Sequence, residues 1–112
     1  MAKRRFSKAY LKKMAEMKKT VSLYAEKFDF KKPNFTNDDV KAMRKLELNN
    51  PDDVTSLTDF ILLLRAAEPL SKSRDSWLDE VDRLEVEFDE KTEAFFAAGN
   101  AKLYLKRQFE VN

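Results

Sequence analysis

A chain of 112 residues with 43% hydrophobic side chains is long enough to bury one core and too apolar to be intrinsically disordered. The absence of histidine and cysteine excludes most hydrolase nucleophile and base pairs and the usual zinc ligands, and a single glycine excludes a glycine-rich phosphate loop. We therefore expect no enzymatic activity, no cofactor and no metal ion, and a cytoplasmic location because no disulfide requires an oxidising compartment.

The charges are sorted along the chain, although the net charge is only +2. Residues 1–32 hold 11 Lys/Arg against 3 Asp/Glu, residues 33–101 hold 8 against 16, and residues 102–112 hold 3 against 1. Such asymmetry is typical of proteins that bind nucleic acid, an acidic surface or another copy of themselves.

Three prolines and one glycine interrupt a sequence that is otherwise rich in helix-forming residues. We predict that residues 1–112 form a single all-α domain in which residues 1–6 are a basic N-terminal arm. Its architecture is either a small bundle of four to five helices or a helical hairpin that completes its core by dimerising. The longest apolar runs are five residues each, so we expect no transmembrane helix and no membrane contact, and nothing apolar follows the basic start as in a secretory signal.

The first helix is predicted from about Ser7 to Phe28, with apolar residues at alternating spacings of four and three. This pattern forms a three-heptad seam that predicts self-association, most simply as a homodimer. The seam residues are Tyr10, Met14, Met17, Val21, Tyr24 and Phe28.

A linker at residues 29–35 leads to a short second helix. Thr36 and Asp39 have the spacing of a capping box and predict its start, and Asn49 with Asn50 predicts its end. Asn50 also predicts the N-cap of a third helix, because proline and then two aspartates follow it. That helix is apolar nearly all the way round and should be the most buried one before Pro69 stops it.

A long acidic fourth helix is predicted from about Ser73 to Ala98, with Gly99 as a left-handed stop. The tail at residues 101–111 fits both strand and helix patterns, and helix is favoured because a lone strand has no pairing partner. Five large apolar residues are weak interface candidates that we expect to lie in the core: Leu62, Leu63, Trp77, Phe95 and Phe96.

The fourth helix carries nine acids within residues 75–93, and Asp75, Asp79 and Asp82 share one face. A hard cation could use such carboxylates, but the loop oxygens that usually hold one are missing. A solvated or ion-paired helix face is therefore the favoured interpretation, and antiparallel packing against the basic first helix would pair the opposite charges.

The candidate binding residues are basic and lie off the apolar seam: Lys3, Arg4, Arg5, Lys8, Lys12, Lys13, Lys18 and Lys19. The first hypothesis is a protein-protein interaction module of the regulator, inhibitor or assembly-factor type, a composition frequent among phage proteins. Its basic first helix meets an acidic protein partner or the acidic fourth helix of a second copy. The alternative is a nucleic-acid-binding protein without sequence preference, because the same lysines could neutralise phosphates.

Overall fold

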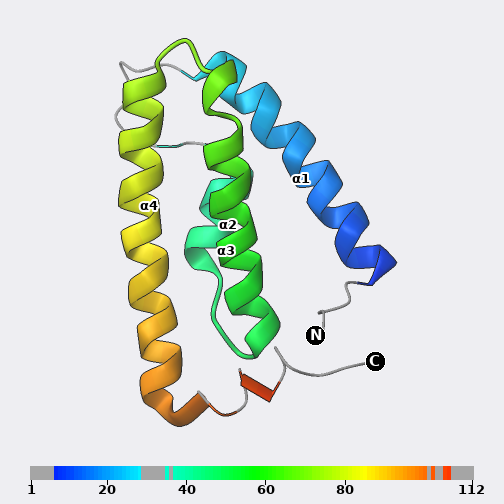
Figure 1. The fold of residues 1–112 in the computed structure, drawn as a ribbon, viewed down its shortest axis with the longest axis vertical. Coiled ribbons are helices and arrows are strands. Elements are labelled where there is room, and N and C mark those ends of the chain that lie inside the picture. The colour runs from blue at the N-terminus through cyan, green and yellow to red at the C-terminus, as the bar shows by residue number, and fades with distance from the viewer. Residues whose placement is uncertain (1–6, 29–34, 36, 101, 103–104, 107–112) are drawn as a thin grey trace.

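The computed structural model describes residues 7–28, 35, 37–100, 102 and 105–106, and within them the chain is a helical bundle without strands (Figure 1). The predicted all-α bundle is confirmed, and its helices share one cluster of buried apolar residues. No helix among the described residues is both long and apolar enough to cross a membrane. In chain order the helices are α1 (Lys8–Lys27), α2 (Asp38–Lys45), α3 (Pro51–Ala66) and α4 (Arg74–Phe95), with a 3-10 turn η1 (Glu68–Leu70) and a π turn η2 (Phe96–Asn100).

The starts of α1 and α3 follow from their caps. The Ser7 hydroxyl accepts a hydrogen bond from the Tyr10 amide at 3.0 Å. At α3 the Asn50 side chain accepts from the Asp53 amide at 3.3 Å, and Asp53 Oδ2 accepts from the Asn50 amide at 3.0 Å. This reciprocal pair is a capping box. The predicted starts of both helices are therefore confirmed, as is the glycine stop after α4, where Gly99 has a φ of 93°.

The ends of α2 differ from the prediction. The N-cap is Asn37, whose side chain accepts from the Asp39 amide at 2.8 Å, and not the predicted Thr36, which lies outside the described residues. The helix also ends at Lys45, before Asn49. Its last carbonyls are held by Lys91 of α4, whose ammonium donates to the carbonyl oxygen of Arg44 and to that of Leu46. A lysine from another helix thus stabilises the C-terminus of α2, and short-range sequence signals cannot reveal this.

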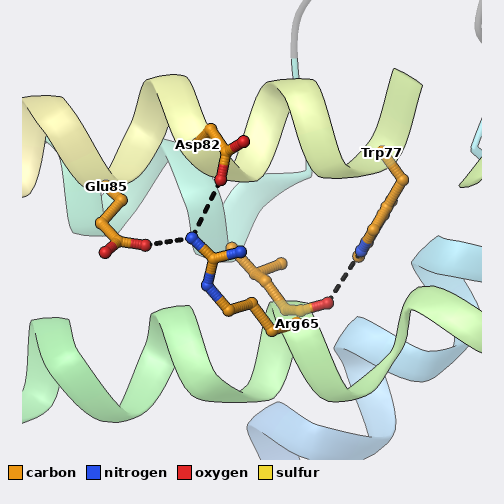
Figure 2. A network of polar contacts seen from close by, with 5 residues as sticks. Arg65, Trp77, Asp82 and Glu85 are labelled. Atoms are coloured by element: carbon orange, nitrogen blue, oxygen red, sulfur yellow. Dashed lines mark hydrogen bonds and ion pairs between the residues drawn. The ribbon is translucent and has the colours of Figure 1, made fainter. Parts of the chain in front are cut away.

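The bundle has α3 at its centre, with α4 antiparallel to it on one side and α1 across it on the other (Figure 1). Trp77 of α4 is fully buried, and its ring lies 5.7, 5.4 and 5.0 Å from the rings of Tyr24, Phe28 and Phe35. Its indole N–H donates to the Leu64 carbonyl of α3 at 2.8 Å (Figure 2). This aromatic cluster joins the end of α1 to the beginning of α4.

The apolar seam of α1 is used within the chain. Met17, Val21 and Phe28 are buried, and Tyr10, Met14 and Tyr24 are half-buried. The chain's own helices cover much of this seam, so the structure does not support the predicted route to a dimer. Heptad spacing is the same whether a seam packs within one chain or pairs two copies, and only the three-dimensional arrangement distinguishes the two contacts.

The expectation of core burial holds for part of the large apolar set. Trp77 and Phe95 are buried, as predicted, whereas Leu63 and Phe96 are half-buried. Leu62 is 58% exposed, because α3 is not covered on every side. It borders a shallow groove of about 170 Å³ between α3 and α4. The prediction that α3 is buried nearly all the way round is therefore wrong at Leu62.

Several predicted segments lie outside the described residues. These are the basic arm at residues 1–6 and the linker at residues 29–34, whereas Phe35 is described and buried. Within the tail only Lys102, Leu105 and Lys106 are described, and their backbone is helical.

One carboxylate of α4 lies in the core. Glu80 is 3% exposed, its Oε1 accepts from Arg83, and its Oε2 has no hydrogen-bond partner among the described residues. A buried acceptor without a partner costs ~1–3 kcal/mol.

We predict that Glu80→Leu raises the free energy of unfolding by about 1 kcal/mol, measured by urea denaturation. Glu90→Leu, at an exposed position of the same helix, is the control and should change it little; a destabilised Glu80→Leu would contradict this description of the site.

Candidate functional site

The five candidate lysines within the described residues are all exposed on α1. They are Lys8, Lys12, Lys13, Lys18 and Lys19. Among the described residues none of them forms an ion pair with a carboxylate. Lys3, Arg4 and Arg5, the other candidates, lie outside these residues. Within the part of the chain that the structure describes, no ion pair therefore neutralises the basic surface of α1.

The five lysines do not share one face, although the sequence suggested a single basic face. Successive residues of a helix are rotated by about 100°, which places Lys8, Lys12 and Lys19 within about 40° of one another. Their direction is opposite to that of the buried Met17 and Val21. We call Lys8, Lys12 and Lys19 the outward lysines. Lys13 and Lys18 point to the two flanks of the helix.

Lys13 faces a groove between α1, α2 and α3 with a volume of about 420 Å³. Its rim also carries Glu16, Asp39 and Asp53, and both apolar and polar side chains line it. Lys13 thus lies in a surrounding of mixed charge, unlike the outward lysines. This difference removes it from the main candidate surface.

Two leucines of α1 are exposed beside the outward lysines. Leu23 is 50% exposed and follows Lys19 by one helical turn, and Leu11 is 54% exposed and follows Lys8 by three residues. The outward half of α1 therefore offers both positive charge and apolar area. The sequence contained a signal for these residues, since both leucines fall outside the heptad seam, but they were not among the predicted candidates.

Several acids of the bundle pair with arginines, and no acid among the described residues pairs with a lysine of α1. Arg65 of α3 donates to Asp82 at 2.9 Å and also to Glu85, both on α4 (Figure 2). The hydrogen bonds that Arg65 donates, with the one to Glu85 having the larger effect and the one to Asp82 the next, raise the pKa of Arg65 above its ordinary value. Arg44 of α2 pairs with Glu87 at 3.1 Å. The predicted pairing of the first helix with the fourth is therefore wrong, because α3 lies between them along most of their length.

The acidic face of α4, with Asp75, Asp79 and Asp82, is not arranged as a cation site. Asp82 is engaged by Arg65, and no group of three or more acidic, histidine or cysteine side chains within the described residues is placed to hold a metal ion. The face is partly ion-paired and otherwise exposed to solvent.

Comparisons with known proteins add no functional information. No protein-family model matches the chain, and the searches of curated proteins and of solved structures each gave no match. Function is therefore inferred from the chain's own charges and packing.

Proposed function

We propose that this chain is a non-enzymatic interaction protein that binds an acidic protein surface through the outward lysines of α1 and the adjacent Leu23. The main support is that the positive charge of the outward lysines is not paired. Lys8, Lys12 and Lys19 point away from the core and have no carboxylate partner among the described residues. A row of like charges without partners repels itself, and an acidic surface relieves that repulsion.

The exposed leucine favours a protein partner over a phosphate backbone. Exposed ion pairs contribute only ~0.2–1 kcal/mol each, so three of them give little affinity without an apolar contact. Burying apolar surface adds ~25 cal/mol per Å², and Leu23 is half exposed where a partner would cover it. Phosphate and sugar edges offer no comparable apolar surface to a leucine. Nucleic acid remains the alternative to be tested.

A titration with two labelled probes tests this proposal. The first probe is a helical Ala-Glu-Leu peptide whose glutamates and leucines share one face, and the second is a duplex DNA of arbitrary sequence. We expect the parent to bind the peptide more tightly than the duplex at equal salt, because only the peptide covers Leu23. The triple variant Lys8→Glu, Lys12→Glu, Lys19→Glu should bind the peptide at least about tenfold more weakly, since three attractions become repulsions.

The matched control changes the net charge by the same amount, but at lysines outside α1. Lys41, Lys45 and Lys72 are exposed outside α1, and their joint replacement by glutamate should change peptide binding by less than about twofold at moderate salt. Tighter binding of the duplex, with a log-log salt slope of about −0.9 per phosphate contact, would instead support the nucleic-acid alternative. Equal weakening by both variants would show that net charge, and not the outward lysines, governs binding.

A further inference from the structure

The face of α4 that points away from the core complements the outward face of α1. By the same rotation of about 100° per residue, Asp79, Glu90 and Glu93 point opposite to the buried Trp77 and Val81. We call these three the outward acids. All three are exposed, and none forms an ion pair within the part of the chain that the structure describes. Val86, which is 58% exposed, lies among them, as does Arg83, which pairs with the buried Glu80.

The two faces are similar in length and agree in chemistry. Lys8 and Lys19 are eleven residues apart and Asp79 and Glu93 fourteen, so the basic row extends over about 16 Å and the acidic row over about 21 Å. Each face combines charge with an exposed aliphatic side chain, Leu23 on α1 and Val86 on α4. Within one chain the two faces do not meet, because α3 separates the helices along most of their length (Figure 1).

We propose that the occupant of the outward face of α1 is the outward face of α4 on a second copy of this chain. This inference rests on the proposed function and names its partner. Charge complementarity selects this pairing over α1 with α1 or α4 with α4, which would bring like charges together.

The positions of the faces determine the kind of assembly. Because α1 and α4 lie on opposite sides of α3, their outward faces point away from each other (Figure 1). A contact between α1 of one copy and α4 of the next is heterologous, and it leaves one free face at each end. The chain therefore associates head to tail into open oligomers of growing length, and not into a closed dimer. A small contact rich in exposed charge makes this association weak and sensitive to salt.

Sedimentation of the parent and of charge-reversal variants tests the proposal. At about 0.02 M salt the weight-average mass of the parent should rise continuously above the 13.2 kDa of one chain as its concentration rises, and at about 1 M salt it should return to that mass. The α1 variant (Lys8→Glu, Lys12→Glu, Lys19→Glu) and the α4 variant (Asp79→Lys, Glu90→Lys, Glu93→Lys) should each stay monomeric. Their equimolar mixture should associate.

The combined variant, with both sets of replacements in one chain, provides the matched control. It has the parent's net charge of +2 and again presents opposite charges on the two faces, so it should associate as the parent does. Circular dichroism checks that each variant is folded. If a charge-reversal variant is unfolded, the same positions are replaced by glutamine, which removes the charge without reversing it. A parent that is monomeric at every concentration, a mass that stops at two chains, or association of a single-face variant overturns the proposal.

The same variants separate this inference from the proposed function. The α4 variant should bind the Ala-Glu-Leu peptide at least as well as the parent, because its outward lysines are intact, whereas the α1 variant should not bind it. A monomeric parent that still binds the peptide through α1 would overturn the head-to-tail contact alone. An α1 variant that binds the peptide like the parent would overturn the proposed function.

Discussion

Replacing Trp77 by alanine is expected to lower the free energy of unfolding by about 4 kcal/mol, because a buried tryptophan leaves a large cavity when it is truncated. Its ring contacts Tyr24, Phe28 and Phe35, so the cavity would open where α1 meets α4. The loss of the indole N–H also leaves the Leu64 carbonyl without its 2.8 Å donor. Domains of this size are stable by ~5–15 kcal/mol in total, so a large part of the stability would be lost.

Thermal denaturation followed by far-ultraviolet circular dichroism measures this effect, since the chain's only tryptophan is removed and fluorescence is not available. The melting temperature of Trp77→Ala should fall by about 15 °C or more. Leu62→Ala, at a side chain that is 58% exposed, should lower it by only a few degrees. Equal effects of the two replacements would contradict the central position of Trp77.

Val21→Asp is expected to unfold the chain at every protein concentration, because Val21 is 1% exposed and a carboxylate there would be buried without a partner. Leu23→Asp, two residues along the same helix, places the same charge on the exposed side and should leave the fold intact. The pair tests whether the seam of α1 lies inside one chain. A seam used only between copies would make Val21→Asp a folded monomer.

Circular dichroism together with sedimentation distinguishes these outcomes. We expect Val21→Asp to lose most of its helical signal, whereas Leu23→Asp retains the parent spectrum and cooperative unfolding. A helical, monomeric Val21→Asp variant would show that the core does not depend on α1.

Local signals in the sequence were sufficient for the elements whose ends are built from neighbouring residues. The capping box of Asn50 and Asp53 and the glycine stop at Gly99 act within a few residues, and both were predictable. The end of α2 was not, because Lys91, 45 residues after Leu46, holds its last carbonyls. The packing partner of the α1 seam was also not predictable, since periodicity identifies an apolar face and not the surface that covers it.

The candidate site was predictable in part. The sequence located the lysines on the exposed side of the first helix, but helical rotation separates Lys8, Lys12 and Lys19 from Lys13 and Lys18. The pairing of Arg65 with Asp82 and Glu85 depends on the packing of α3 against α4, so the sequence could not show that these two acids pair with an arginine and not with the lysines of α1. Leu23 was not predictable as a site residue, because an isolated exposed leucine is common on protein surfaces.

Capture from a nuclease-treated extract of the source cell tests most directly whether the outward lysines form the binding surface. The immobilised parent and the control variant with Lys41, Lys45 and Lys72 replaced by glutamate should retain the same protein partner at low salt. The variant with Lys8, Lys12 and Lys19 replaced by glutamate should lose it, although its net charge is the same as that of the control. Retention of that partner by the outward-lysine variant, or loss of every partner on nuclease treatment, would contradict the proposal.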